Sequence, residues 1–177
     1  LDWMTEETKK KAIEKLDKFT VKIAYPDEWR DYSEMKVKEG NSYAENMLAV
    51  MEWQQKENLS EINEPIDKKR WGMPPQMVNA YFNPINNEIV FPAAILQPPF
   101  YNYTADEAVN YGGIGAVIGH EISHAFDDSG ARFDADGNVN NWWTPEDLTE
   151  FEKRGNALAD QYSAIEVLDS VFVNGPF

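Results

Sequence analysis

The spacing of apolar residues predicts a helix near each end of the chain. From Thr5 to Phe19, apolar residues recur every three or four positions, which is the repeat of a helix with one apolar face. This stripe consists of Ala12, Ile13, Leu16 and Phe19. Near the other end, Thr144 precedes Pro145, and an N-cap followed by proline is typical of a helix start. The same spacing then continues through Leu148, Phe151, Leu158 and Tyr162.

Two further helices are expected between these. Ser42 and Glu45 have the spacing of a capping box, so a helix begins there and frays near Asn58. Its buried side is expected to consist of Met47, Val50 and Met51.

The other helix is expected over residues 105–126. Thr104 and Glu107 form a second capping box, and no proline interrupts the helix. Its glycines are Gly112, Gly113, Gly115 and Gly119. They lack the G-x-G-x-x-G spacing of a dinucleotide-binding loop, so close packing of a buried helix explains them better.

Residues 76–91 have the pattern of a β-hairpin. Two short β-type runs, 76–82 and 88–91, flank a turn rich in asparagine and proline. The prolines cannot donate to a central ladder and therefore favour strands near a sheet edge. Such an edge can bind an extended peptide as an added strand, and the side chain of Asn79 can add hydrogen bonds there. An asparagine in an ordinary edge strand is the alternative. Together these elements predict an α+β, mainly helical fold.

Composition narrows the class of protein. Of the 177 residues, 42% are hydrophobic, which is enough for a packed core in one domain or part of one. The net charge of −15 argues against nucleic acid and anionic membranes as partners, because both bind basic surfaces. There is no cysteine, hence neither a disulfide framework nor a thiolate zinc site. We find no signal peptide and no apolar run near the length of about 18 residues that a membrane span needs, so membrane insertion by this segment is not expected.

The only two histidines of the chain belong to an H-E-x-x-H motif, His120-Glu121-Ile122-Ser123-His124. Residues four apart on a helix lie on one face, so His120 and His124 can bind one metal ion. Glu121 lies about 100° further round the helix, within reach of a water on that metal. Zinc is the usual metal of this motif, and the glutamate is the usual general base for hydrolysis. Two ordinary helix histidines are the alternative, which the uncharged flanks disfavour.

The motif supplies two of the three protein ligands that a catalytic zinc takes. A metzincin is excluded, because Asp127 and Gly130 occupy the places of its glycine and third histidine. Asp127 or Asp128 can bind the metal, but a carboxylate beside a ligating histidine more often fixes its tautomer, and a surface aspartate at a helix end is a third alternative. Residues 134–138 resemble the start of a calcium loop, but later ligand positions are missing, so a tight turn is expected.

Several long segments around these features resemble one known family. They are Val78–Pro84, Asn87–Phe100 and Asn110–Asp128, followed in order by Gly137-Asn138 and Trp142-Trp143-Thr144. These segments closely resemble the neprilysin (M13) family of zinc metallopeptidases, and the resemblance covers nearly the whole chain. The chain is about a quarter of a typical member in length.

The resemblance implies a fold and a domain organisation. Residues 1–177 are expected to form part of a thermolysin-like zincin catalytic domain, with 1–70 as a helical N-terminal part and 71–177 as the active-site part. The family's third zinc ligand lies in a G-E-N-x-x-D segment, which we expect beyond Phe177, and its transition-state histidine follows later. The absence of cysteine suggests a bacterial member.

The resemblance also assigns roles to single residues. It implies one Zn²⁺ bound by His120 and His124, with Glu121 as the catalytic residue. Asp127 is expected to orient a ligand, and Asn79 with Ala80 is expected to hold the substrate backbone.

We therefore expect a zinc metalloendopeptidase that hydrolyses peptide bonds of oligopeptides through a zinc-bound water, with Glu121 as general base. Its expected partners are the oligopeptide substrate and the remainder of the catalytic domain. Because the third zinc ligand is missing here, a metal-free peptide-binding or structural module is one alternative. An exopeptidase is another, because H-E-x-x-H does not set a preference for internal bonds.

Overall fold

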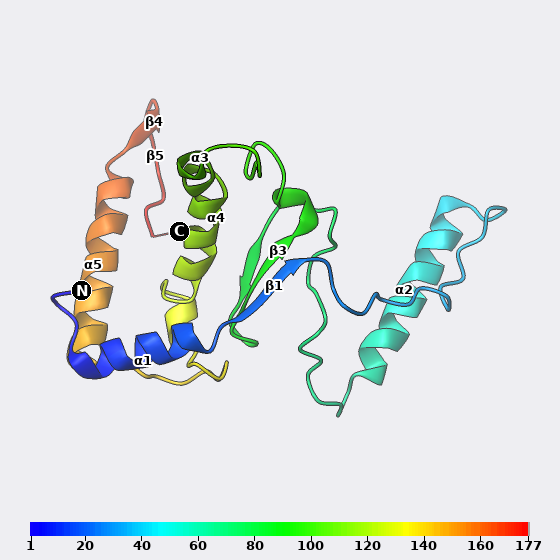
Figure 1. Cartoon of the computed structure of the whole chain (residues 1–177), viewed down its shortest axis with the longest axis horizontal. Coiled ribbons are helices and arrows are strands. Elements are labelled where there is room, and N and C mark those ends of the chain that lie inside the picture. The colour runs from blue at the N-terminus through cyan, green and yellow to red at the C-terminus, as the bar shows by residue number, and fades with distance from the viewer. Residues whose placement is uncertain (177) are drawn as a thin grey trace. The chain divides into compact units, whose positions relative to one another are not determined.

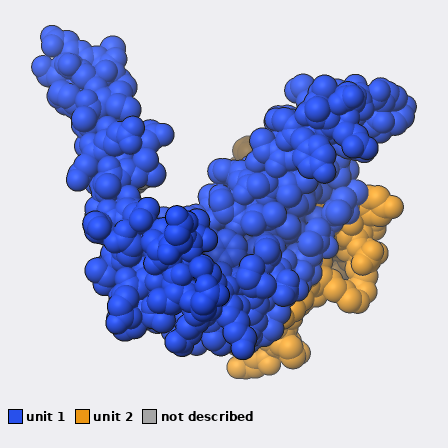
Figure 2. Space-filling model, turned by 60° about the vertical axis from the view of Figure 1, so that its left-hand side comes forward, with its two compact units in different colours: residues 1–24, 75–177 blue, residues 25–74 orange. Residues whose placement is uncertain are grey.

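The computed structural model describes residues 1–176, which divide into two compact units. Unit 1 contains residues 1–24 and the chain from 75 onward, and unit 2 contains residues 25–74; they are blue and orange in Figure 2. Among the described residues, every helix is too short or too polar to cross a lipid bilayer.

Unit 2 is built on a single helix, α2 (Tyr43–Ser60). It begins as the sequence predicts, since the Ser42 side chain accepts a hydrogen bond from the Glu45 backbone N–H and the Glu45 side chain accepts one from the Ser42 backbone. The capping box therefore fixes this helix start by local chemistry alone.

The predicted buried face of α2 is wrong for two of its three residues, and Val50 is half-buried. Met47 and Met51 are exposed, and the buried residue of the helix is Trp53. The guanidinium of Arg30 lies 4.6 Å from the centre of the Trp53 ring, and the Tyr32 ring lies 5.3 Å away. A flat aromatic face buries more surface and also attracts a cation, so the segment before the helix packs on Trp53 rather than on the methionines.

Unit 1 contains a three-stranded sheet (Figure 1). Its strands are β1 (Thr20–Ala24), β2 (Tyr81–Asn83) and β3 (Glu88–Pro92), in the order β1-β3-β2. β2 and β3 form the predicted hairpin, although the first strand begins at Tyr81 and not at Gln76. β1 pairs with β3 in parallel over its whole length, and this pairing was not predicted.

The core of unit 1 lies between this sheet and the metal-motif helix. It consists of Ala80, Ile89, Phe91, Ile95 and Ile114. Ile95 belongs to a short 3-10 turn, η1 (Ala93–Ile95), that follows β3. All five residues of β3 are buried, as expected for the middle strand of a covered sheet.

The single helix expected over 105–126 is two helices, α3 (Glu107–Gly112) and α4 (Ile114–His124). The break lies at Gly113, where a side chain would collide with the Phe100 carbonyl oxygen, and this oxygen accepts a 2.7 Å hydrogen bond from the Ile114 N–H. Close packing thus explains Gly113, but not Gly112 or Gly119, where an added Cβ would meet no atom within 4 Å. The N-cap of α3 is Asp106 and not Thr104.

Helix α1 (Glu6–Asp17) begins after its N-cap Thr5, close to the predicted position. Its expected apolar face is confirmed only at Phe19, which packs against the core; Ile13 and Leu16 are exposed, and the buried residues are Thr8 and Lys15. Both buried side chains bond to polar groups far away in the sequence, which an apolar residue cannot do.

The chain ends with α5 (Pro145–Ser163), capped by Thr144 as predicted. An antiparallel pair, β4 (Glu166–Leu168) and β5 (Val171–Phe172), follows it. The starts of α5 and α1 are joined, because the Asp147 carboxylate accepts hydrogen bonds from the backbone and side chain of Thr5, and the Thr144 N–H donates to Thr8 Oγ1.

Candidate active site

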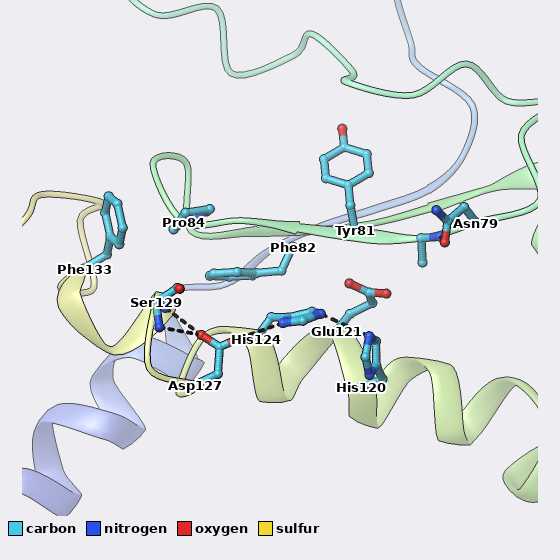
Figure 3. A pocket seen from close by; sticks show the side chains of 12 residues that line it. Asn79, Tyr81, Phe82, Pro84, His120, Glu121, His124, Asp127, Ser129 and Phe133 are labelled. Carbon is cyan, nitrogen blue, oxygen red and sulfur yellow. Dashed lines mark hydrogen bonds and ion pairs between the residues drawn. The ribbon is translucent and has the colours of Figure 1, made fainter. Parts of the chain in front are cut away.

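A cavity of about 410 Å³ lies between strand β2 and helix α4 (Figure 3). Its floor is the last turns of α4 and the segment that follows, including the short 3-10 turn η2 (Gly130–Arg132). Six of its lining residues were singled out from the sequence. They are Asn79, Ala80, His120, Glu121, His124 and Asp127.

The two histidines point the same way from α4. Their Nε2 atoms are 3.0 Å apart and their ring planes are inclined by 79°. Two nitrogens that bind one tetrahedral zinc at about 2.0–2.1 Å stand about 3.3 Å apart. The observed spacing is close to this value, so the pair has the geometry and the donor atoms to hold a zinc ion.

Asp127 contacts one of these imidazoles. Its Oδ2 lies 2.7 Å from His124 Nδ1, while its Oδ1 accepts hydrogen bonds from the N–H groups of Ser129 and Gly130. A carboxylate at Nδ1 holds the ring proton there, so that the Nε2 lone pair faces the cavity. Of the two aspartates after the motif, Asp127 is the one in contact with the ring.

Glu121 lies on the β2 side of α4, with 5% of its surface exposed. Burial raises the pKa of its carboxyl group, and the nearby His120, His124 and the backbone N–H of Phe82 oppose this effect. A carboxylate with a raised pKa inside a cavity is suited to accept a proton from a reactant.

Asn79 and Ala80 directly precede β2, which is an edge strand of the sheet and pairs with β3. The Ala80 N–H donates a 2.9 Å hydrogen bond to Oδ1 of Asn79, and this bond holds the Asn79 side chain against the backbone. The Asn79 side chain is exposed, and its amide nitrogen Nδ2 can donate a hydrogen bond to a peptide carbonyl.

A supporting residue was missed by sequence reasoning. Lys15 is 1% exposed, and its ammonium donates hydrogen bonds to the carbonyl oxygens of Ala125, Gly130 and Phe133, at 2.7, 2.8 and 2.8 Å. Burial lowers its pKa to about 8, although Asp134 and Asp127 act in the opposite direction. No sequence signal distinguishes this lysine from its exposed neighbours.

The tight turn expected near residue 134 is present. Gly137 has a φ of +83° and its N–H donates to the Asp134 carbonyl. Within residues 1–176, no three histidine, cysteine or acidic side chains are grouped so that they could hold a metal ion. In the described part of the chain, the cavity therefore offers two histidine nitrogens that can bind a metal ion.

Comparison with known proteins extends these observations. Two sequence models described as Peptidase family M13 match the chain, over residues 1–26 and 79–177. Neutral endopeptidase of Lactococcus lactis subsp. cremoris is 46% identical over 166 residues, which cover 93% of this chain and 26% of that protein.

Solved structures agree with this match. The crystal structure of Mycobacterium tuberculosis zinc metalloprotease Zmp1 in complex with inhibitor has a TM-score of 0.93 and 51% identity, and covers 99% of this chain and 28% of that one. PepO from Lactobacillus rhamnosis HN001 has a TM-score of 0.90 and 39% identity, over 98% of this chain and 28% of that one. The chain thus spans between a quarter and a third of these relatives' lengths.

The M13 resemblance and the α+β fold class expected from the sequence are both confirmed by these matches. The match to the family covers the H-E-x-x-H helix, the hairpin and the N-terminal helix together. The chain belongs to Peptidase family M13.

Proposed function

We propose that this chain is part of the catalytic domain of a zinc metalloendopeptidase. One observation carries the proposal: two histidine nitrogens 3.0 Å apart and a buried glutamate share one cavity with the edge strand β2. The relatives support it, since they include a neutral endopeptidase and a zinc metalloprotease.

His120 and His124 hold the zinc ion through Nε2, and Asp127 keeps His124 in the tautomer that does so. Zinc, when bound, polarises the scissile carbonyl and makes a water more acidic. A third ligand is expected from a residue that follows Phe177.

Glu121 accepts the proton of the attacking water and passes it to the leaving amine. Its burial between α4 and β2 keeps the carboxylate close to the place where the peptide lies. Asn79 and the edge strand β2 align an extended oligopeptide as an added strand, so that the scissile bond faces Glu121.

The test is Glu121→Gln in the protein at its full length. Zinc should stay bound at one ion per molecule while kcat/KM for an oligopeptide falls by about 100- to 10,000-fold, the usual contribution of a general base. Glu152→Gln, on the exposed face of α5, is the matched control and should keep full activity. Undiminished cleavage by Glu121→Gln would contradict the assignment.

A metal-free binding module is the second candidate, because residues 1–176 contain no group of three side chains that could hold a metal ion. Metal analysis separates the two: one zinc per molecule supports the enzyme, and none supports the binding module. A peptide with both ends blocked then tests the preference for internal bonds, since an exopeptidase leaves it intact.

A further inference from the structure

Lys15 is a charged side chain buried where the helix pattern predicts an ordinary surface residue. An ammonium group has three N–H donors, and the carbonyl oxygens of Ala125, Gly130 and Phe133 accept three hydrogen bonds of 2.7–2.8 Å. All three acceptors belong to the segment that leaves α4 and passes under the cavity. One side chain of α1 therefore ties together nine consecutive residues, 125–133, that carry a wall of the candidate active site.

The surroundings of Lys15 favour a cation. Ala125 is the C-cap of α4, where the negative end of the helix dipole lies. The rings of Phe82, Phe126 and Trp142 have their centres 5.7–6.0 Å from the ammonium nitrogen. Burial of a charge is costly, so a side chain needed only for packing would be apolar. The charge at this position must therefore serve the groups that it binds.

A continuous line of hydrogen bonds leads from Lys15 to the metal motif. Its ammonium donates to the Gly130 carbonyl, the Gly130 N–H donates to Asp127 Oδ1 at 2.7 Å, and Asp127 Oδ2 lies 2.7 Å from His124 Nδ1. Gly130 also packs so closely on the end of α4 that a side chain there would collide with the His124 carbonyl oxygen. The segment is held from two sides and has little freedom to shift.

The hydrogen bonds of Lys15 join the two parts of the chain that match the family. Lys15 lies in residues 1–26, and its acceptors lie in residues 79–177. Trp142 and Trp143 bind the far end of the segment, by donating to Phe133 and Ala131. Lys15 donates to the carbonyl of Ala125, which follows His124 directly in the chain, and to that of Gly130.

We propose that Lys15 is a positioning residue of the active site, which fixes the Asp127 carboxylate and, through it, the tautomer and orientation of the His124 ring. The effect of Lys15 on zinc binding rests on the proposed function, because it requires that His124 is a zinc ligand. The hydrogen-bond line itself is a property of the zinc-free protein, and this allows the two to be tested separately.

The first experiment observes the His124 ring in the zinc-free, full-length protein by ¹⁵N NMR, at a pH where the ring is neutral. In the wild type we expect one tautomer, with the proton on Nδ1 facing Asp127. In Lys15→Met we expect both tautomers. Lys18→Met is the matched control, because Lys18 follows three residues later and its ion pairs with Glu14 and Asp136 are exposed. It should leave the ring signals unchanged.

The second experiment measures the zinc dissociation constant of the same proteins. Loss of a group that orients a metal ligand typically weakens binding 10- to 100-fold, and we expect Lys15→Met at the lower end, at about tenfold. Lys15→Arg keeps a charged donor and should bind zinc more tightly than Lys15→Met. If Lys15→Met does not fold, the milder Lys15→Gln is measured with the same expectations.

Two results would overturn the proposal. One is a single, wild-type tautomer in the Lys15 variant; the other is a wild-type zinc affinity in a variant whose thermal stability alone has fallen. Failure of the proposed function looks different: the wild type would then bind no zinc or cleave no peptide, while the NMR spectra of the zinc-free proteins would still show whether Lys15 fixes the His124 ring.

Discussion

Helices α1 and α4 are of similar length, and both support the same cavity, yet they do so in opposite ways. In α4 the important residues are His120, Glu121 and His124, which line the cavity. In α1 the important residues are Thr8 and Lys15, which are buried away from solvent. The role of α4 is recognised by the types and spacing of its residues. The role of α1 is recognised only by what its side chains touch.

The difference has a physical cause. A metal ligand or a general base must be a particular side chain, so its presence limits the choice of residue and leaves a motif. A positioning residue such as Lys15 acts on backbone carbonyl groups, and every residue has one. The acceptors Ala125, Gly130 and Phe133 therefore carry no mark of their role in the sequence.

The largest expected effect comes from the segment that both helices hold. In Gly130→Ala the new methyl group collides with the His124 carbonyl oxygen, and we expect the free energy of unfolding to fall by about 1–3 kcal/mol. Gly155→Ala is the control, since its Cβ would meet no atom within 4 Å inside α5 and should stabilise by about 0.5–1 kcal/mol. Chemical denaturation followed by tryptophan fluorescence measures both. Equal stability of the two variants would mean that the segment is loosely packed.

An intermediate effect is expected from the contact between the segment and α4. Asp127→Ala removes the acceptor at His124 Nδ1, and we expect the zinc dissociation constant to rise about 10- to 100-fold. Asp128→Ala removes the same charge from an exposed neighbouring position and should change the affinity little. Calorimetric titration of zinc into the metal-free proteins gives both values. A similar loss in both variants would show that net charge, and not ring orientation, is responsible.

The smallest effect concerns the other anchor of α1. Burial works to raise the pKa of Asp147, but hydrogen bonds from Thr5, Thr8 and Thr144 outweigh it and hold the pKa at about 2, below its usual 3.8. Folding therefore favours the ionised carboxylate. Its contribution to stability is complete above about pH 4 and is lost as the pH falls toward 2.

Asp147→Asn should accordingly be less stable than the wild type at neutral pH, and the difference should narrow between pH 4 and pH 2. Thermal unfolding across this range measures it. Asp160→Asn, on the exposed part of α5, is the control and should follow the wild type. A constant gap between Asp147→Asn and the wild type would show that the carboxylate is not held in its ionised form.

Local features of the fold were predictable because neighbouring residues decide them. The Ser42–Glu45 capping box, the Thr144 cap and the hairpin strand at 88–91 all appear where the sequence places them. Features that depend on distant partners were not predictable from the sequence. The parallel pairing of β1 with β3 and the break at Gly113 under the Phe100 carbonyl have no local signature.

The sequence by itself determined the chemistry of this protein: an H-E-x-x-H motif, an aspartate three residues later and the family to which both belong. The tertiary structure decided what surrounds that chemistry. It placed β2 opposite Glu121, joined Asp127 to His124, and brought Lys15 of a distant helix under the segment that holds them. Side-chain spacing encodes the ligands, but the supporting contacts go to backbone oxygens that no residue type identifies, and only folding selects them.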